Sequence, residues 1–310
     1  MGDLGVNALW AVIGLPVSLI SLLYFALSRR KNVVLQDKVV FITGASSGLG
    51  EACAEAFHFC GCKVILAGRN EHKLVELKNR LDSKKLCHQH SPVVCVLDLE
   101  DDCIDDKVRL AIASIWGRID ILINNAGMSY RGAVSETKSD VDMKLMVVNH
   151  LGHIKITKAI LPFMVEQKSG HIVCISSVQG RMAIPHRSAY AASKHAMQAY
   201  FDSLRAEVEH YGINVCVVSP YYIRTNLSLN ALSADGSTHG KHDQTTLNGY
   251  DPHFVAQKIV NCVQRRCDEL ILAPFYVKLA ICLRVLAPWL YFKIMARRAK
   301  KELSANDKHK

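Results

Sequence analysis

The stretch Thr43-Gly44-Ala45-Ser46-Ser47-Gly48-Leu49-Gly50 decides the fold of this chain. It follows the apolar run Lys38–Thr43 and precedes the amphipathic segment Glu51–Cys60, so its glycines lie in a turn between a strand and a helix. Glycines there permit a tight turn and a close approach of the backbone to a pyrophosphate at the helix N-terminus. The spacing TGxxxGxG differs from the commoner GxGxxG, and taken alone it is only moderate support for dinucleotide binding.

On both sides of this turn, short apolar runs alternate with helix-length segments. The runs are Lys38–Thr43, Lys63–Ala67, Val93–Leu97, Ile119–Ile123, His171–Ser176 and Ile213–Ser219, and the helical segments include Glu51–Cys60, His72–Leu81, Asp142–Glu166 and Tyr190–His210. Runs rich in Val and Ile without alternation are typical of buried parallel strands joined by helices. The pattern predicts an α/β fold, a doubly wound parallel sheet of Rossmann type in one domain, with its ligand crevice at the carboxyl ends of the strands. We place this catalytic domain at residues 37–270.

Composition and charge exclude several classes of protein. The chain has 310 residues, 50% hydrophobic and 21% charged, which excludes collagen-like, disordered and small disulfide-stapled proteins. Its formal net charge of +10 is concentrated at the two ends, at residues 29–31 and 293–310, and the body is nearly neutral. A nucleic-acid partner is therefore not expected, because reading DNA or RNA needs a basic face or groove.

The cysteines point to a reduced compartment and not to metal binding. There are eleven, an odd number, and several lie in apolar strand-like runs, as Cys95, Cys174 and Cys216 do. We expect a reduced domain that faces the cytosol. The cluster Cys87, His88 and His90 has no second ligand pair at zinc-finger spacing, so it is interpreted as a polar loop and no metal site is predicted.

The N-terminus predicts a membrane anchor in residues 1–31. No residue from Leu4 to Ser28 is charged, a length that suffices for one transmembrane helix, and Arg29, Arg30 and Lys31 follow directly. A cleaved signal peptide is the alternative, but it needs a basic stretch before a shorter apolar run. The positive-inside rule then places the catalytic body in the cytosol. The expected location is the endoplasmic reticulum membrane, single-pass, with the peroxisomal membrane as the alternative.

Two further segments stand out near the C-terminus. The polar stretch Asn226–Asn248 is either a surface loop or a lid over the crevice, and we favour the lid. The segment Leu272–Ala299, within the C-terminal region 271–310, is apolar but interrupted by lysines and arginines, so its runs are too short for a second span. We expect a helix packed on the body; contact of its apolar face with lipid, which suits the basic tail, is an open alternative to plain packing.

Residues after the next three strands suit a dinucleotide. The second strand ends in Gly68-Arg69, where an acid would select NAD; arginine suits the 2′-phosphate of NADP instead, so NADP(H) is the preferred cofactor and NAD(H) the alternative. The third strand ends in Asp98-Leu99, where a carboxylate can hold the adenine amino group. The fourth ends in Asn124-Asn125-Ala126-Gly127, whose amides can brace the central strands and the cofactor.

Taken together, these motifs make the sequence resemble the short-chain dehydrogenase/reductase family over residues 37–270. TGASSGLG, NNAG, Asn149, Ser177 and Tyr190-Ala191-Ala192-Ser193-Lys194 occur in the family's order and spacing. Within the family the chain is similar to the membrane-anchored member 7 subgroup, closest to its B branch. The resemblance implies catalytic residues Asn149, Ser177, Tyr190 and Lys194, with Ser177 and Tyr190 also contacting substrate. It implies cofactor contacts at Gly44, Ser46, Ser47, Gly48, Leu49, Gly50, Arg69, Asp98, Leu99, Asn125, Ala126, Gly127, Tyr190, Lys194, Pro220 and Thr225.

The chemistry of the catalytic residues can also be argued directly. Tyr190 and Lys194 are four apart on a predicted helix and therefore lie on one face. A free tyrosine has a pKa near ~10, too high for efficient proton exchange at neutral pH. A nearby ammonium, and the positive nicotinamide of the oxidised cofactor, are expected to lower the pKa of Tyr190. Ser177 can hold the substrate oxygen, and Asn149 can fix a water that relays protons to Lys194. The alternative, a core tyrosine and a surface lysine, is weak because all four residues occur in order.

One position departs from the family pattern. The family has Pro-Gly and then a threonine that contacts the nicotinamide carboxamide, whereas here Tyr221 follows Pro220 and Thr225 is retained. A side chain in place of glycine is expected to reshape the pocket mouth or to weaken nicotinamide binding. This leaves the reaction type intact and puts the substrate preference in doubt.

The predicted substrate is a lipophilic ketone or alcohol. Residues expected to face the crevice are mostly apolar: Met128, Tyr130, Val178, Met182, Ile184, Tyr222 and Leu227. Two of the arginines Arg131, Arg181, Arg187 and Arg224, if they converge, can clamp a phosphate. The resemblance then implies acyl- or alkyl-dihydroxyacetone phosphate. Exposed loop arginines, a steroid or retinoid substrate, and an NADP-binding membrane scaffold with little turnover are the alternatives.

Self-association is expected from the resemblance. In this family the helices corresponding to 142–166 and 190–210 commonly pair across a two-fold axis, which implies a homodimer or homotetramer. Their apolar positions are also compatible with ordinary core packing.

Overall fold

The computed structural model of the chain describes residues 18, 19, 23, 32–84, 90–241 and 243–307. Contacts divide the chain into two units, Met1–Val33 and Val34–Lys310. The predicted membrane anchor lies almost wholly outside the described residues. Among the helices that are described, none combines the length and the apolarity needed to cross a bilayer.

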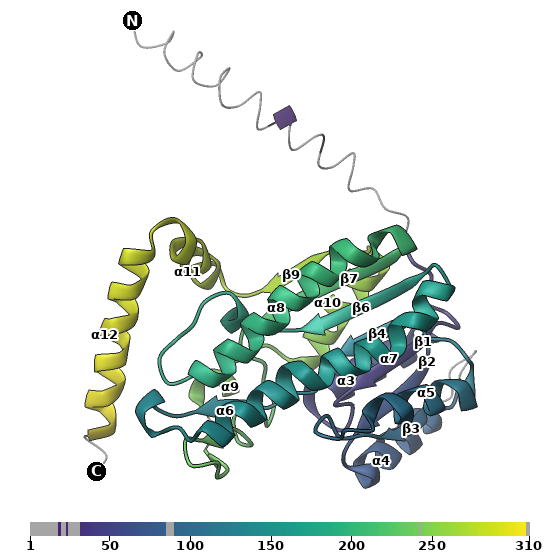
Figure 1. Cartoon of the computed structure of the whole chain (residues 1–310), viewed down its shortest axis with the longest axis horizontal. Helices are drawn as coiled ribbons and strands as arrows, with labels where there is room; N and C mark the ends of the chain where they lie inside the picture. The colour runs from purple at the N-terminus through teal and green to yellow at the C-terminus, as the bar shows by residue number, and fades with distance from the viewer. Residues whose placement is uncertain (1–17, 20–22, 24–31, 85–89, 242, 308–310) are drawn as a thin grey trace, which may run out of the picture. The chain divides into compact units, whose positions relative to one another are not determined.

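The second unit is built on a seven-stranded parallel sheet in the order β3-β2-β1-β4-β6-β7-β9 (Figure 1). The strands are β1 (Val39–Thr43), β2 (Lys63–Gly68), β3 (Val93–Val96), β4 (Ile121–Asn124), β6 (Gly170–Ile175), β7 (Ile213–Pro220) and β9 (Glu269–Leu272). The chain runs from β1 outward to β3 and then crosses back to β4, so the topological switch point lies between β1 and β4. The predicted doubly wound α/β fold is confirmed, with β9 as one strand more than the sequence indicated.

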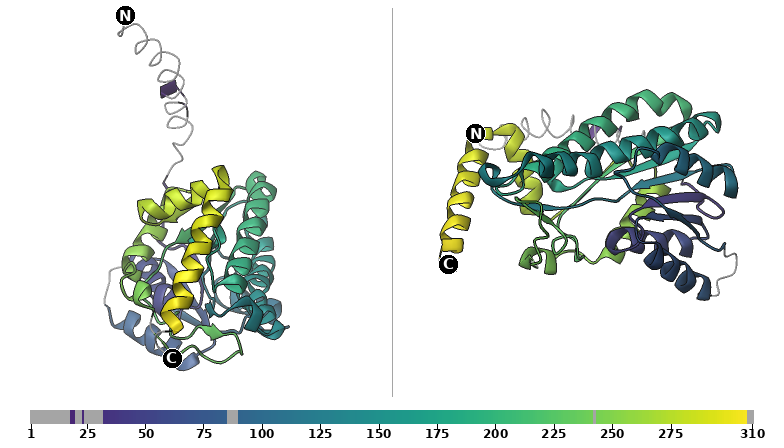
Figure 2. Two further views of the ribbon diagram at one scale, coloured as in Figure 1. Left: turned by 90° about the vertical axis from the view of Figure 1, so that its left-hand side faces the viewer. Right: turned by 60° about the horizontal axis from the view of Figure 1, so that its bottom comes forward.

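Helices cover both faces of this sheet, which explains its uninterrupted apolar strands. Helices α3 (Gly48–Phe59) and α10 (Pro252–Gln264) pack on each other on one face, and α5 (Ile104–Ile115) and α7 (Gly152–Glu166) do so on the other (Figures 1 and 2). Helix α8 (Ser188–Val208) packs on β7, and α4 (Glu71–Ser83) lies against β2 and β3. Strands β1, β4, β6 and β7 are buried along their whole length, as parallel strands between two helical layers must be.

The predicted helix Asp142–Glu166 is present, but it is not α-helical throughout. The structure has α6 (Ser139–Met146), a π-helical turn at Val147–Leu151 (η3), and then α7. A π turn is rare and is frequent at functional sites. Here it contains Asn149, whose side chain is fully buried.

The structure also describes the two segments singled out near the C-terminus. Leu272–Ala299 was expected as one helix, which is wrong: α11 (Phe275–Leu286) and α12 (Pro288–Asp307) are separated at Ala287, because a proline disfavours the helical conformation of the residue before it. The stretch Asn226–Asn248 contributes β8 (Leu232–Ser233), which pairs in parallel with β5 (Tyr130–Arg131), and the short helix α9 (Gln244–Leu247).

Candidate active site

A cleft of about 740 Å³ opens at the carboxyl ends of the strands next to the switch point. It is lined by the ends of β1, β2, β4, β6 and β7 and by the segment that follows β7. Of the residues predicted to be catalytic or cofactor-binding, all but Gly50 and Asn149 line it. A single crevice therefore brings together residues that are as far apart in sequence as Gly44 and Thr225.

The glycine-rich turn forms a cradle at the start of α3. Gly44 and Gly48 have φ angles of +67° and +59°, which favour glycine because it has no Cβ. A Cβ on Gly50 would lie 2.2 Å from the Gly44 carbonyl oxygen, so Gly50 is a packing residue beneath the turn and not a lining residue. The side chain of Ser47, the N-cap of α3, caps no backbone N–H, and Ser46, Ser47 and Leu49 line the cleft. This narrow backbone turn suits a pyrophosphate at a helix N-terminus.

The NNAG motif braces β1 against β4, as predicted. The backbone N–H groups of Asn125 and Ala126 donate to Oγ1 of Thr43 at 2.9 and 3.0 Å, and Nδ2 of Asn125 donates to the Thr43 carbonyl at 2.9 Å. The buried ring of His153 supports this loop from below, with Nε2 2.7 Å from the Ala126 carbonyl oxygen. Burial lowers the pKa of His153 to about 3. His153 could not be identified from the sequence, because a lone histidine in a helix forms no recognisable pattern.

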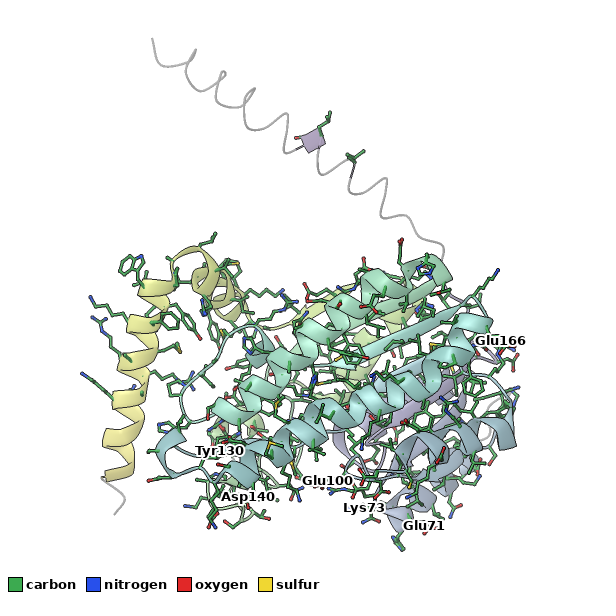
Figure 3. All side chains as sticks on the ribbon, viewed as in Figure 1. Glu71, Lys73, Glu100, Tyr130, Asp140 and Glu166 are labelled. Carbon is green, nitrogen blue, oxygen red and sulfur yellow. The ribbon has the colours of Figure 1, made fainter. Side chains whose placement is uncertain are left out.

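The outer end of the cleft holds two cationic side chains. Arg69 is largely exposed, and its Nη1 lies 4.0 Å from carboxylate oxygens of both Asp98 and Glu100, too far for hydrogen bonds. Lys73, from the first turn of α4, lines the same end and is labelled in Figure 3. No carboxylate ends β2, because Gly68 stands there. Lys73 was not predicted to bind the cofactor. The signal that could have found it is its position four residues after Arg69, which places both side chains at the start of α4.

Ser177, Tyr190 and Lys194 lie together, all buried, at the inner end of the cleft. Ser177 follows β6 and hydrogen-bonds to the Tyr190 hydroxyl. Lys194 is one turn further along α8; its Nζ lies 5.9 Å from the Tyr190 ring centroid and donates to the Ile175 carbonyl at 2.9 Å. The three side chains can hold a carbonyl oxygen, give it a proton and place a cation behind the donor.

The protonation states differ from the expectation for Tyr190. Burial raises its pKa, and the hydrogen bond from Ser177 and the positive charges of Arg131 and Arg187 reduce this rise without cancelling it. Burial also lowers the pKa of Lys194 to about 8. The expected net lowering of the Tyr190 pKa is therefore not met in this structure, because burial outweighs the groups that favour the phenolate. At neutral pH Tyr190 is a protonated phenol, as a proton donor must be.

Asn149 acts from behind the cleft wall. Its Oδ1 accepts from the Met128 N–H at 2.8 Å, and its Nδ2 donates to the Met128 carbonyl at 2.9 Å and to Oγ of Ser193 at 3.0 Å. A Cβ added to Gly127 would lie 3.1 Å from Oδ1 of Asn149 and 3.8 Å from Nζ of Lys194. Asn149 therefore fixes the backbone beside Lys194, and its relay through a water stays a prediction.

Tyr221, the departure from the family pattern, stands at the edge of the cleft. Its hydroxyl accepts a hydrogen bond from the Tyr276 hydroxyl at 3.1 Å, and its ring contacts Tyr222 edge-on, with centroids 4.8 Å apart. It also lines a second cavity of about 350 Å³, shared with Tyr250, Tyr276 and the α9 region. Pro220 and Thr225 both line the main cleft.

The residues predicted to face the substrate fall into two sets. Met128, Val178, Tyr222 and Leu227 line the cleft. The prediction is wrong for Tyr130, Met182 and Ile184, which are buried in the protein core; Tyr130 packs on Val141 and Leu145, and Met182 on Val277 and Tyr291. Gln179, which was not predicted, lines the cleft with its Oε1 buried and without a hydrogen-bond partner among the described residues.

The four loop arginines separate into a convergent pair and two others. Nη2 of Arg131 and Nη2 of Arg187 lie 3.3 and 3.4 Å from the same oxygen of Asp243, with side chains 9% and 13% exposed. Arg181 pairs with Glu269, and Arg224 pairs with Asp251 at 2.8 Å.

Comparison with known proteins agrees with this geometry. The model of the short chain dehydrogenase family matches residues 38–235. The chain is 48% identical over 273 residues to dehydrogenase/reductase SDR family member 7B of Mus musculus, which covers 88% of this chain and 84% of the relative. It is 46% identical to the protein of the same name from Xenopus tropicalis. That alignment of 303 residues covers 96% of this chain and 98% of the relative.

Solved structures share the fold. A short-chain dehydrogenase from Streptomyces avermitilis is 27% identical with a TM-score of 0.70, over 86% of this chain and 99% of that chain. A short chain dehydrogenase/reductase from Burkholderia phymatum in complex with NAD is 23% identical with a TM-score of 0.72, over 83% of this chain and 96% of that chain.

Proposed function

The chain belongs to the short-chain dehydrogenase/reductase family, an NAD(P)-dependent family of oxidoreductase enzymes, and from this premise we propose that it is an NADP(H)-dependent carbonyl reductase for a lipophilic ketone. The leading substrate is acyl- or alkyl-dihydroxyacetone phosphate. The observation that carries the proposal is the group Ser177, Tyr190 and Lys194 at the inner end of the cleft.

The residues of the chain suit carbonyl reduction. The Ser177 and Tyr190 hydroxyls hold the carbonyl oxygen of the ketone, and Tyr190 gives its phenolic proton to that oxygen as it becomes an alcohol. Lys194, charged below pH about 8, stabilises the phenolate that remains. A bound nicotinamide dinucleotide supplies the hydride to the carbonyl carbon. In the opposite direction, alcohol oxidation, Tyr190 must first lose its proton.

The outer end of the cleft supports the choice of NADP(H). Arg69 and Lys73 offer two cations at the end of β2, and Gly68 leaves no carboxylate there to repel a 2′-phosphate. Gly44 and Gly48 line the cleft at the start of α3, where a pyrophosphate would lie. NAD(H) stays the alternative.

The inner end of the cleft supports a lipid ketone that carries a phosphate. Met128, Val178, Tyr222 and Leu227 provide apolar surface, and Arg131 lines the same cleft. Arg187 does not line the cleft, but it shares the Asp243 carboxylate with Arg131, so the pair keeps a net positive charge near Tyr190. A steroid or a retinoid would use the apolar surface and leave the arginine pair unused.

The proposed setting is a membrane. Residues 4–28 are uncharged and precede Arg29, Arg30 and Lys31, so we propose a single-pass anchor in the endoplasmic reticulum, or alternatively in the peroxisomal membrane, with the catalytic domain in the cytosol. A homodimer or homotetramer through α6–α7 and α8 is part of this proposal.

The test is NADPH oxidation by the full chain in nanodiscs, with acyl-dihydroxyacetone phosphate, a steroid ketone and retinal as substrates. The expected result is turnover of the phosphorylated ketone that falls at least 100-fold in Tyr190→Phe, which keeps the ring and removes the proton donor. Preferential turnover of the steroid or retinal would overturn the substrate. NADPH binding without turnover of any ketone would overturn the proposed reaction.

A further inference from the structure

Helix α11 carries an exposed apolar stripe. Phe275, Leu279, Cys282 and Leu286 follow one another at intervals of four, three and four residues, so they share one face of the helix. All four are exposed, Phe275 at 81% and Leu286 at 83%. Trp289 at the start of α12 adds a large aromatic surface, 69% exposed. Isolated exposed apolar residues are ordinary, but a continuous stripe of this size marks an interaction surface.

The opposite side of the two helices fixes this stripe to the catalytic body. Val277 and Tyr291 are buried and pack on Val178 and Met182, and the Tyr291 hydroxyl donates to the Ala183 carbonyl. Figures 1 and 2 show α11 and α12 together at the end of the catalytic unit opposite α4 and α5. The stripe is therefore held in place next to the loop between β6 and α8, which forms part of the cleft.

The charge around the stripe has one sign. Residues 270–301 contain no aspartate or glutamate, and they contain seven lysines and arginines, which begin with Lys278 and Arg284. The guanidinium carbon of Arg284 lies 4.8 Å from the centroid of the Phe292 ring, so its cation stands beside apolar surface. Long basic side chains that border an apolar helix face are typical of helices that lie on a membrane.

We propose that the α11 stripe and Trp289 rest on an anionic lipid bilayer, with the apolar side chains among the acyl chains and the lysines and arginines at the phosphates. A second copy of this chain is a poorer occupant, because a two-fold contact would bring two sets of like charges together without acids between them. Anionic headgroups offer the complementary charge. This contact is separate from the predicted anchor in residues 1–31.

The bilayer contact also sets where a lipid substrate reaches the cleft; this step rests on the proposed function. Tyr276 directly follows Phe275 of the stripe, and its hydroxyl bonds to Tyr221 at the cleft edge. The second cavity, of about 350 Å³, lies against the same two tyrosines. The Tyr221–Tyr276 edge is thus the side from which a ketone dissolved in the membrane enters.

Trp289 provides a direct measurement of the contact. The full chain is reconstituted in nanodiscs of phosphatidylcholine and phosphatidylserine with brominated acyl chains, and its tryptophan fluorescence is compared with that of Trp289→Phe. Trp10 and Trp116 are common to both proteins, so the difference reports Trp289 alone. The expected result is a strongly quenched difference signal, and an unquenched one overturns the proposal.

A paired variant tests the stripe itself and separates it from the proposed reaction. In Leu279→Asp/Leu286→Asp we expect the quenching of Trp289 to fall at least threefold and turnover of a membrane-dissolved ketone to fall at least fivefold, with turnover of a water-soluble ketone unchanged. Leu110→Asp, at an exposed leucine on α5, is the matched control and should change neither. Unchanged quenching accompanied by loss of a dimer in light scattering would assign the face to a second copy and overturn the proposal. If the parent protein turned over no ketone, the proposed reaction would be refuted, but the quenching experiment would still test the membrane contact.

Discussion

Nη2 of Arg131 lies 3.3 Å from Oδ2 of Asp243, although 112 residues separate them in the chain. Arg187 reaches the same oxygen, so one carboxylate ties the segment after β7 to β5 and to the start of α8. These side chains are mostly shielded from water, where ion pairs are stronger than at an exposed surface. Burial opposes ionisation of Asp243, but the hydrogen bonds from Thr245 and the charges of Arg131 and Arg187 outweigh it and hold the Asp243 pKa below its usual range, so the carboxylate stays ionised.

Replacing both arginines tests whether this pair selects a phosphate. In Arg131→Gln/Arg187→Gln we expect kcat/KM for the phosphorylated lipid ketone to fall at least 30-fold, through loss of about 2 kcal/mol of charge-assisted bonding, and kcat/KM for a neutral ketone to fall less than threefold. Arg181→Gln, which removes an ion pair with Glu269 at a residue that does not line the cleft, is the control and should change neither. Equal losses on both substrates would show that the pair is structural.

Arg69 and Lys73 test the cofactor preference. In Arg69→Gln/Lys73→Gln we expect the ratio of kcat/KM for NADPH to that for NADH to fall at least 10-fold, because both cations line the end of the cleft where the 2′-phosphate, which NADH lacks, would lie. Steady-state kinetics with both cofactors measures the ratio. Arg80→Gln, which removes a cation on the same helix that is paired with Glu51 and Glu55, should leave the ratio unchanged. A parent protein that already prefers NADH would contradict the assignment.

Gly50 and Gly68 differ in the space available to a methyl group. Gly50→Ala would place its Cβ 2.2 Å from the Gly44 carbonyl oxygen, and we expect a loss of about 3 kcal/mol or more in the free energy of unfolding. Gly68→Ala would meet Oγ of Ser46 at 3.5 Å, an ordinary contact, and should stay within about 1 kcal/mol of the parent. Urea unfolding of both variants gives the comparison, and similar losses would refute the packing role of Gly50.

His153 gives the stability a defined dependence on pH. Its pKa is about 3 in the folded chain and near 6.5 when unfolded, so between these values the unfolded state binds a proton that the folded state does not. Stability must therefore fall as pH falls from about 6.5 toward 3, by about 1.4 kcal/mol per pH unit. His171, whose pKa is lowered to about 4, adds a similar loss of stability as the pH falls from about 6.5 toward 4.

His153→Gln removes one of these two contributions. We expect its free energy of unfolding to be lower at pH 7, where the contact with Ala126 is altered, and to decline less steeply between pH 6 and 4.5 than that of the parent. Urea titrations at four pH values measure both slopes. Parallel slopes would mean that His153 is protonated in the folded chain.

Much of the cleft follows from local sequence signals. The glycine-rich turn, NNAG and the pair Tyr190 and Lys194 each depend on spacing within one turn or one helix, and the parallel sheet places them at one edge. Strand β9 was missed because its four residues begin with an acid and pair with residues of β7 that lie 52 positions earlier in the chain. No local pattern marks such a strand.

Contacts between distant segments set the other differences. From the sequence, any two of the four loop arginines could have converged. Only the structure shows that Arg131 and Arg187 do so, at one oxygen of Asp243. The pKa of Tyr190 likewise depends on how deeply the fold buries it, which outweighs the neighbouring charges. Tyr130 and Met182 are close in sequence to residues that line the cleft, which is why they were predicted to line it too. They are buried in the core instead, because α6 packs on Tyr130 and α11 packs on Met182.

The π turn at Val147–Leu151 has a consequence for insertions and deletions. A π turn holds one residue more than an α turn, so the extra residue is absorbed there and α6 and α7 both keep their buried faces on the sheet. Deleting one residue within this turn would restore a regular helix and leave the packing of Leu145 and Ile156 nearly intact. It would remove Asn149 from Met128 and Ser193. The fold could lose this residue over evolutionary time, whereas the catalytic centre could not.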